Sequence, residues 1–339
     1  MQTNKSQRNV KIISEIHPQF LGSTNEIKRV ILQSKIGGSD YVKVQLYNSK
    51  KLFNNQDREY LEISKNELKD IKKFSEDHGI ELTASIFDEE SLNFVQDRLR
   101  NKYIKIPSGE LNNYFILDKI KTKNLIIISS GMSTLHDIAQ SINRIYKKKI
   151  YKITKKDITK VNKNFLRKIK NKICVMHCVT DYPVENRFAN LLSISFLKNK
   201  LGLNIGYSDH TKCDTAAIAA ASLGITMIEK HFTLNKKMKG PDHKASLEPK
   251  EFKEMVRKIR IVEEMLGKYN KEIQQCEIKN IKIAKKNIVA KKNINKGEKF
   301  TLENITAKRP YRNFGPSKID MILGKKAKRT FIENEKIIL

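Results

Sequence analysis

Two short segments of the chain end in clusters of ionisable side chains, and each cluster closes with a histidine. Residues 206–211 contain His210, and residues 228–232 contain His231. Both segments begin with apolar residues typical of a buried strand. Imidazoles on two neighbouring strand ends can hold one metal ion, because neutral imidazole is a common ligand. The alternative is two ordinary histidines with satisfied hydrogen bonds, and the spacing alone leaves both interpretations open.

The composition limits the possible partners. The chain has 339 residues, enough for one large domain and a small second one, and a formal net charge of +30 at pH 7. Such a surface attracts nucleic acid, anionic membranes or anionic small substrates. The lysines are spread along the whole chain among carboxylates, and no zinc finger or RNA-recognition strand occurs. We therefore expect no specific nucleic-acid binding.

Cysteine usage and hydropathy bear on the compartment. The four cysteines form no CxxC pair, and Cys174 and Cys178 share one apolar run, which indicates reduced thiols. No apolar segment has the length of a signal peptide or a membrane span. We expect a soluble cytoplasmic protein without a membrane partner.

Strand-like and helix-like segments alternate through the first part of the chain. Thr24 is a candidate N-cap for one helix, and Ser64 with Glu67 forms a capping-box pattern for the next. The expected strands are residues 10–16, 41–46, 80–85, 103–108, 125–130, 173–178, 204–208 and 226–231. The expected helices are residues 24–35, 64–78, 88–99, 113–121, 134–146, 191–200, 211–223 and 249–266. This alternation predicts an α/β protein with a (β/α)8 TIM barrel, with a doubly wound open sheet as the alternative.

The remaining segments differ in texture. Residues 147–172 are rich in lysine and weakly periodic, which predicts an elaborated loop or extra helix inserted into the barrel domain of residues 1–267. Residues 268–282 are polar and resemble a linker. Residues 283–339 contain short β-type runs separated by turn signals, which predicts a small β-rich second domain.

Polar side chains stand at the carboxyl end of nearly every expected strand, where TIM-barrel enzymes hold their catalytic groups. Any single one could be a strand-end residue without a function, but the set in register favours an anionic substrate and a metal. They are Glu15, Lys43, Gln45, Ser85, Lys105, Ser108, Glu110, Ser129, Ser130, His177, Thr180, Tyr182, Ser208, Asp209, His210, Glu229, Lys230 and His231.

These motifs resemble those of the N-acetylneuraminate (sialic acid) synthase family, in its bacterial sialic and legionaminic acid branch. Its members condense phosphoenolpyruvate with an N-acyl hexosamine aldehyde to give a nine-carbon 2-keto sugar acid and phosphate. The C-terminal domain is similar to the antifreeze-like SAF domain of these enzymes. The matching segments are residues 14–16, 42–45, 105–110, 129–133, 177–178, 182–183, 206–211, 228–233, 240–246 and 308–310.

The resemblance implies roles for individual residues. His210 and His231 would ligate a divalent ion, Mn²⁺ or Mg²⁺, that polarises the sugar aldehyde. Glu15 would handle water or a proton near C2 of phosphoenolpyruvate. The positions that match the cradle for its carboxylate and phosphate are Lys43, Lys105, Ser85, Ser108, Ser129 and Ser208.

The resemblance also implies an acceptor pocket and an assembly. Arg309 would reach the barrel mouth of a second subunit and meet the N-acyl group of the amino sugar, so a domain-swapped homodimer is expected. The other positions implied to bind substrate are Glu110, Asp242, Tyr182, Gln45 and Thr180.

The chain departs from the family pattern beside Glu15. Residues 17–20, His-Pro-Gln-Phe, replace the usual Gly-x-Asn-His, while Ser85 stands at a common threonine and Thr180 at a common asparagine. The departures leave the acceptor open among N-acetylmannosamine-type and 2,4-diacetamido-trideoxyhexose sugars. A scaffold that has lost catalysis, or a basic nucleic-acid-associated protein, remain the alternatives from other classes.

Overall fold

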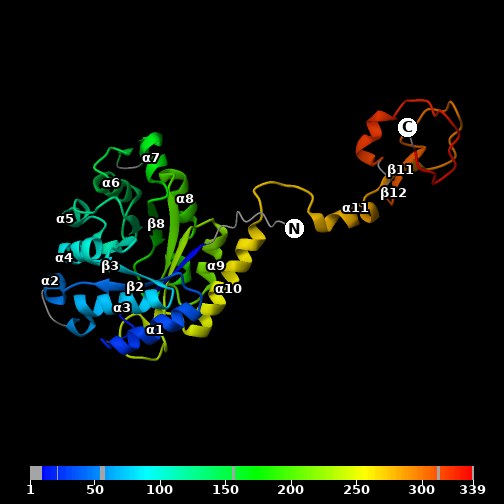
Figure 1. The fold of residues 1–339 in the computed structure, drawn as a ribbon. Helices are drawn as coiled ribbons and strands as arrows, with labels where there is room; N and C mark the ends of the chain where they lie inside the picture. The colour runs from blue at the N-terminus through cyan, green and yellow to red at the C-terminus, as the bar shows by residue number, and fades with distance from the viewer. Residues whose placement is uncertain (1–9, 21, 54–57, 155–156, 311–313, 338–339) are drawn as a thin grey trace. The chain divides into compact units, whose positions relative to one another are not determined.

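The fold was analysed in a computed structural model that describes residues 10–20, 22–53, 58–154, 157–310 and 314–337. The chain divides into two compact units, Met1–Gly267 and Lys268–Leu339. In the first unit, eight parallel strands close into a barrel in the order β1-β10-β9-β8-β5-β4-β3-β2. Figure 1 shows the strands of this unit with helices around them. The predicted (β/α)8 barrel is therefore confirmed, and the alternative prediction of an open doubly wound sheet is wrong.

The barrel strands are short and largely buried, because helices cover their outer faces. They are β1 (Lys11–Glu15), β2 (Tyr41–Leu46), β3 (Glu81–Ile86), β4 (Tyr103–Ile106), β5 (Leu125–Ser129), β8 (Ile173–Cys178), β9 (Asn204–Asp209) and β10 (Met227–His231). The helices of this unit include α1 (Thr24–Ile36), α2 (Ser49–Phe53), α3 (Lys65–Asp77), α4 (Glu89–Asn93), α5 (Tyr114–Leu117), α6 (Leu135–Ile145), α7 (Lys163–Ile169), α8 (Leu192–Leu201), α9 (Thr215–Ser222) and α10 (Pro249–Leu266).

Local sequence signals explain several helix boundaries. The Ser64 hydroxyl accepts a bond from Glu67 N, and Ser64 N donates to the Glu67 carboxylate, which completes the predicted capping box of α3. The N-cap of α1 is Ser23, not Thr24, because the Ser23 hydroxyl accepts the bond from Glu26 N. The capping hydroxyl therefore stands one residue before the predicted one.

Other predicted helices are shorter or irregular. The helix expected at 88–99 is α4 followed by a π-helical segment, Phe94–Leu99, that ends at Arg100 with a φ of 53°. The helix expected from residue 211 begins only at Thr215. The basic segment 147–172 holds a hairpin of β6 (Tyr151–Ile153) and β7 (Ile158–Val161), followed by α7. Propensity alone did not reveal this hairpin, because its alternation spans only a few residues.

The second unit has its own small core. Strands β11 (Asn287–Ala290) and β12 (Ile305–Lys308) pair antiparallel, and the core around them includes Ile288, Phe300 and Phe331. Residues 268–282 are not uniformly irregular, because α11 (Ile278–Ala284) begins within them. Of the β-type run expected at 337–339, residues 338–339 lie outside the described residues.

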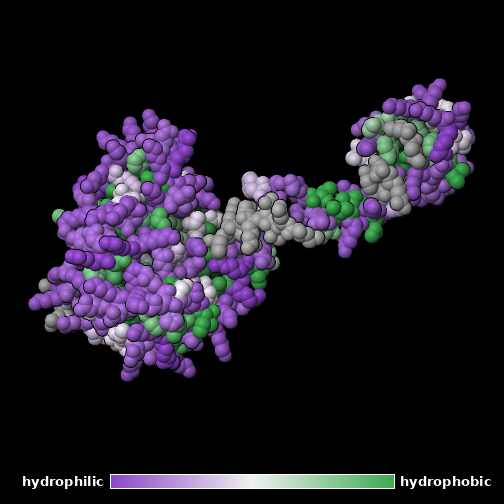
Figure 2. All heavy atoms as spheres, viewed as in Figure 1, coloured by the Kyte–Doolittle hydropathy of each residue, from purple (hydrophilic) through white to green (hydrophobic). Residues whose placement is uncertain are grey.

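Charged and polar side chains dominate the face seen in Figure 2, with scattered apolar residues among them. Among the helices of the described residues, none has the length and apolar character needed to cross a bilayer.

Helix α10 packs against the residues that follow β10 and α1. Phe252 is fully buried, and its ring meets Phe232 edge to face at 5.2 Å between centroids. One turn later Val256 packs against Gly38, whose φ of +95° and tight space exclude a larger residue: a Cβ there would lie 3.0 Å from Val256 Cγ1. The apolar face of α10 thus joins the last helix of the barrel unit to the residue after β10 and to the turn after α1.

We predict that Phe252→Ala lowers the free energy of unfolding by about 3–5 kcal/mol, because a large fully buried ring is replaced by a cavity. Met265→Ala on the same helix is the control: Met265 is 79% exposed, so its loss should change stability by about 0.5 kcal/mol or less. Urea unfolding followed by circular dichroism measures both. Equal effects of the two substitutions would contradict the packing described for α10.

Candidate active site

The barrel interior divides into an apolar layer and a polar layer. Side chains of a strand alternate between its two faces, so every second residue of each strand points inward. Toward the amino ends of the strands an apolar cluster fills the interior, with Ile13, Tyr41, Ile127, Met176 and Met227 among its members. The next inward residues along the same strands are ionisable or hydroxylic, so the polar groups gather at the carboxyl ends.

Four ionisable side chains form one buried charge cluster at this level: Glu15, Lys43, Lys105 and Glu229. The Lys43 ammonium lies 2.5 Å from Glu15 Oε2 and 3.1 Å from Glu229 Oε1. The Lys105 ammonium lies 2.6 Å from Glu229 Oε2. Since β4 and β10 stand on opposite walls of the barrel, Lys105 spans its interior. All four side chains are at most 6% exposed.

The environment separates the two carboxyl groups of the charge cluster. Burial, reinforced by the neighbouring Glu229 carboxylate, raises the pKa of Glu15 to about 7 despite the pull of Lys43. Burial also acts on Glu229, but its contacts with Lys105 and Lys43 prevail and hold the pKa of that carboxyl well below its usual range. Glu229 is thus a fixed anion, whereas Glu15 can gain or lose a proton near neutral pH.

The two lysines of the charge cluster differ in the same way. Burial lowers the pKa of Lys105, which has one carboxylate partner. The pKa of Lys43 is raised in spite of burial, because Glu15 and Glu229 both favour its charged form. Lys43 also donates to the Ser85 hydroxyl at 3.0 Å. Two ammonium groups and several hydroxyls therefore face one small volume, which suits an anion with more than one negative group.

The histidine pair, His210 and His231, lies above the charge cluster, with ring centroids 5.5 Å apart. The ring of Tyr182 lies against both, at 4.3 Å from the His210 centroid and 5.7 Å from that of His231. Burial lowers the pKa of His210 to about 4, and burial with the nearby His210 lowers the pKa of His231 well below its usual range. Both imidazoles are therefore neutral at pH 7, as metal ligation requires.

The hydrogen bonds of His210 leave one ring nitrogen directed at the site. The His210 Nδ1 lies 2.7 Å from the Val179 carbonyl oxygen, which can only accept, so Nδ1 carries the proton and donates. The other ring nitrogen, Nε2, therefore has a free electron pair, and it lies 3.3 Å from the Ser208 hydroxyl. Among the described residues no group of three or more His, Cys, Asp and Glu side chains surrounds a possible ion. The histidine pair fits a metal that takes two protein nitrogens and completes its shell with water or substrate oxygens.

Hydroxyl groups line the wall between β4 and β9. Ser108 Oγ accepts from Gly131 N at 3.1 Å, and Ser208 Oγ donates to Glu229 Oε1 at 3.0 Å. Ser129 is buried, and the buried Thr180 hydroxyl has no partner within the described protein. The wall is tight at Gly131, where a Cβ would come within 2.1 Å of Thr180 Oγ1 and 2.7 Å of Ser108 Oγ. This glycine therefore brings backbone N–H and two hydroxyls together.

The remaining predicted residues lie around this centre or outside the barrel unit. Burial raises the pKa of Glu110, which accepts a bond from Asn113 Nδ2 at 2.6 Å. Burial also raises the pKa of Asp242. Gln45, half-buried on β2, is in register with Ser85. Arg309 is exposed on the second unit.

Three polar strand-end residues turn away from the mouth. Asp209 and Lys230 pair with each other outside the barrel wall at 3.0 Å. His177 Nε2 donates to the Ala189 carbonyl at 2.9 Å, and the His177 ring stacks on Tyr207. The expectation that they face the mouth is wrong, because each has the opposite strand parity from its inward-facing neighbours.

The sequence assigns no role to two residues of the site. Glu229 is among the strand-end candidates, and its position two residues before His231 places it on the same face of β10. Gln19 belongs to the segment that departs from the family pattern, and its Nε2 lies 3.4 Å from His231 Nδ1 and 3.3 Å from Ser246 Oγ. Only the fold brings Gln19 to His231, since the two are far apart in sequence.

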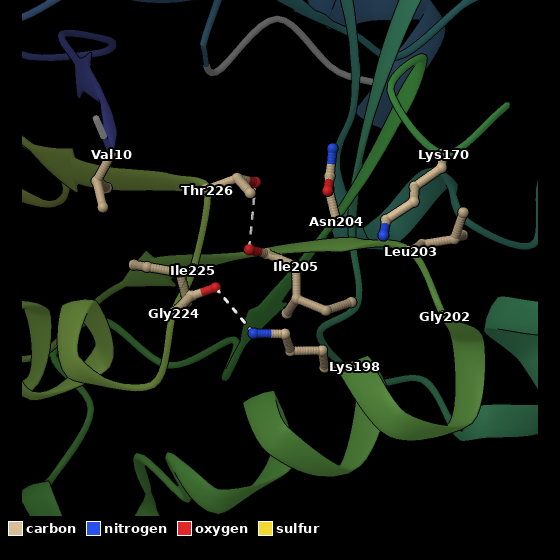
Figure 3. A pocket seen from close by; sticks show the side chains of 10 residues that line it. All are labelled: Val10, Lys170, Lys198, Gly202, Leu203, Asn204, Ile205, Gly224, Ile225 and Thr226. Atoms are coloured by element: carbon tan, nitrogen blue, oxygen red, sulfur yellow. Dashed lines mark hydrogen bonds between the residues drawn. The ribbon is translucent and has the colours of Figure 1, made fainter. Parts of the chain in front are cut away.

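A separate cavity of ≈ 340 Å³ lies at the opposite, amino-terminal end of the strands (Figure 3). Lys198 on its wall donates to the Gly224 carbonyl at 3.3 Å, and Lys170, Asn204 and Thr226 supply further polar groups. The described residues that line it include no carboxylate or imidazole. We therefore place the chemistry at the carboxyl ends, where acid, base and cationic groups converge.

A (β/α)8 barrel with a titratable carboxyl, two buried lysines and two neutral histidines at its carboxyl ends defines an enzyme of the TIM-barrel class. Residues 30–271 match the NeuB family and residues 286–337 match the SAF domain. The chain belongs to the NeuB family, and it is an enzyme of the phosphoenolpyruvate-dependent transferase class of that family's acid synthases.

Named relatives agree with this family. The chain is 34% identical to the N,N'-diacetyllegionaminic acid synthase of Campylobacter jejuni, over 96% of this chain and 98% of that one. It is 32% identical to the N-acetylneuraminate-9-phosphate synthase of Homo sapiens, over 96% and 91% of the two chains. The crystal structure of the N-acetylneuraminic acid synthetase of Leptospira borgpetersenii in complex with citrate superposes with a TM-score of 0.69 at 28% identity, covering 81% of this chain and 91% of that one.

Proposed function

We propose that this chain condenses phosphoenolpyruvate with the open-chain aldehyde of an N-acyl amino sugar and water, giving a nonulosonic acid and phosphate. The observation that carries the proposal is the charge cluster directly below the histidine pair, at the carboxyl end of a NeuB-family barrel. C3 of phosphoenolpyruvate bonds to the aldehyde carbon, water adds at C2, and the bond from C2 to the phosphate oxygen breaks. The water oxygen becomes the keto oxygen at C2. One proton of the water ends on the former aldehyde oxygen, which becomes a hydroxyl, and the other ends on the leaving phosphate.

The charge cluster supplies the site for phosphoenolpyruvate. Lys43 and Lys105 would hold its carboxylate and phosphate, aided by the hydroxyls of Ser85, Ser108, Ser129 and Ser208. Both ammonium groups already contact Glu229, so the anion would enter a volume in which cations are fixed before it binds. Removal from water strengthens these charge interactions, since the side chains are nearly inaccessible to solvent.

Glu15 is the proposed base for the hydration step. Its pKa near 7 lets the carboxylate accept a proton from the water that adds at C2 and release it afterwards. Its contact with Lys43 keeps it beside the phosphoenolpyruvate site. A general base poised at neutrality also argues against a scaffold that has lost catalysis.

The histidine pair is the proposed site of a divalent ion, Mn²⁺ or Mg²⁺. When bound, such an ion supplies a Lewis acid for the aldehyde oxygen. His210 and His231 would hold it through neutral ring nitrogens, while Tyr182 packs against both rings and keeps their orientation. Gln45, Glu110, Thr180, Tyr182 and Asp242 would bind the hydroxyl and N-acyl groups of the sugar.

The acceptor is proposed to be an N-acetylmannosamine-type sugar, with a 2,4-diacetamido-trideoxyhexose, and thus a legionaminic or pseudaminic acid product, as the alternative. The chain is 34% identical to the legionaminic acid synthase and 32% identical to the human N-acetylneuraminate-9-phosphate synthase, so sequence identity does not favour one acceptor class strongly over the other. Exposed Arg309 would contact the N-acyl group in the barrel of a second copy, so the proposed assembly is a domain-swapped homodimer. The free cysteines suit a reducing compartment such as the cytoplasm.

The first prediction concerns the acceptor. Purified protein with Mn²⁺ and phosphoenolpyruvate should release phosphate only when one sugar of a panel is added. The panel contains N-acetylmannosamine, 2,4-diacetamido-2,4,6-trideoxymannose and 2,4-diacetamido-2,4,6-trideoxyaltrose, and mass spectrometry identifies the product. Each nonulosonic acid should carry the three carbons of phosphoenolpyruvate. Absence of release with all three sugars would contradict the proposed acceptor class.

The second prediction concerns the histidine pair. His210→Ala and His231→Ala should each abolish metal-dependent turnover and leave the far-UV circular dichroism spectrum unchanged, because each removes one of two protein ligands. His136→Ala is the control, since His136 is half-buried on α6, bonds the Thr154 carbonyl and belongs to neither the histidine pair nor the charge cluster. Wild-type turnover by either site variant in the presence of a chelator would rule out the metal assignment.

The third prediction concerns Glu15. Because the carboxylate is the active form, kcat/KM should fall as the pH drops through about 7, the pKa of this buried group. Glu15→Gln should lower kcat by about 10²–10⁴-fold and remove that step from the pH profile. The matched control is Glu81→Gln, whose carboxyl also has a pKa raised by burial but lies at the amino end of β3. If kcat/KM of Glu15→Gln still fell through the same pH range, the titrating group would be a residue other than Glu15.

A further inference from the structure

A fully buried ion pair lies behind the histidine pair, on the outer face of the barrel wall. Asp209 is the residue before His210 on β9, and Lys230 is the residue before His231 on β10. Their side chains are both 0% exposed, and Lys230 Nζ lies 3.0 Å from Asp209 Oδ2. The pair does not belong to the charge cluster, because it occupies the opposite strand faces.

The ammonium group of Lys230 binds the loop that carries His210. Besides Asp209, it donates to the backbone carbonyls of Thr211 and, at 3.1 Å, of Cys213. An ammonium group has three hydrogens, and all three are engaged by this one loop. Asp209 is held in turn, since its Oδ1 accepts from Thr211 N at 2.9 Å and from the Tyr207 hydroxyl at 3.3 Å. The residues on both sides of His210 are thus bound to a side chain of β10.

His210 also has anchors on its other side, from the loop after β8. Val184 N donates to the His210 carbonyl at 2.9 Å, and the His210 ring bonds the Val179 carbonyl. These contacts fix His210 relative to β8, whereas Lys230 fixes the same loop relative to β10, which carries His231. Lys230 and Asp209 also lie opposite each other in the backbone pairing of β9 with β10, so the side-chain pair extends that connection to the loop that carries His210.

The energetics argue that this pair serves a purpose other than stability. Removing two charges from water costs several kcal/mol per ion, and apolar residues of similar volume are often at least as stabilising. A buried pair gives a defined geometry in return, because charge-assisted hydrogen bonds tolerate little change in length and direction. In this chain the buried pair fixes the conformation of the loop between Asp209 and Cys213.

We infer that Lys230, through Asp209 and the carbonyls of the His210 loop, is a positioning residue that sets the spacing of the histidine pair for metal binding. The inference rests on the proposed function for the identity of the ligand, a divalent ion. It adds that residues that touch neither substrate nor metal hold the His210 loop against the strand that carries His231.

The test measures metal affinity without turnover. Mn²⁺ is titrated into metal-free, substrate-free protein, and free Mn²⁺ is followed by electron paramagnetic resonance. Lys230→Met and Asp209→Asn should each weaken Mn²⁺ binding by about 10–100-fold, the usual effect of losing a residue that orients a ligand. Asp209→Asn preserves volume, so it tests the inference if Lys230→Met fails to fold.

The matched control removes another Lys–Asp ion pair from the same loop. Lys258 Nζ lies 2.8 Å from Asp214 Oδ2 in a partly exposed pair beyond Cys213. Lys258→Met should leave Mn²⁺ affinity within about twofold of wild type, because exposed pairs contribute little and this one does not join the two histidine strands. Thermal melts of all variants separate lost stability from lost affinity.

A second readout does not depend on metal. Crystal structures of metal-free wild type and Asp209→Asn should differ in the separation of the histidine rings, which is 5.5 Å between centroids in the wild type. Unchanged Mn²⁺ affinity and unchanged ring separation in a destabilised variant would overturn the inference and leave the pair a structural one. If His210→Ala binds Mn²⁺ as tightly as wild type, the proposed metal site fails, and the ring separation alone then decides the positioning role.

Discussion

The active-site end of the barrel depends on Glu229, the carboxylate that among the described residues contacts both Lys43 and Lys105. Two ammonium groups in a volume closed to water would repel each other and lose protons, and burial already lowers the pKa of Lys105. Glu229 balances them at 2.6 and 3.1 Å, and Glu15 adds a second negative charge beside Lys43. The cluster is close to neutral without substrate. An entering anion would disturb that balance, and the proton that Glu15 is proposed to accept from the water at C2 would move the cluster back towards neutrality.

Much of the fold could be predicted from the sequence because barrel strands and helices leave strong local patterns. The capping box at Ser64 and the boundaries of α10 follow from residues next to each other in the chain. Because active sites of barrel enzymes lie at the carboxyl ends of the strands, the predicted strands also indicate most of the candidate site residues. The alternation of side chains along each strand further divides these candidates. It places Glu229 and His231 inside the barrel and Lys230 outside it.

Other features could not be predicted because they depend on contacts between distant residues. Lys105 meets Glu229 across the barrel, and no pattern near either residue indicates that contact. The late start of α9 at Thr215 has a similar cause, since the carbonyls of the preceding residues bond Lys230 on another strand and are held out of a helix. In the second case the ammonium group of Lys230 overrides the local helix propensity of residues 211–214.

The segment 17–20 shows how the chain compensates for its departure from the family pattern. His17 is buried against Phe20 and Tyr47, and burial lowers its pKa to about 3, so it remains neutral and behaves as an aromatic packing residue. Gln19 points the other way, toward His231 and Ser246, and its buried Oε1 has no partner within the described protein. A buried acceptor left free beside a proposed metal ligand is costly unless a bound molecule satisfies it. The altered loop therefore places a buried amide beside His231 and packs His17 among aromatic rings. Its backbone also reaches the charge cluster, because His17 N donates to Glu15 Oε1 at 2.9 Å.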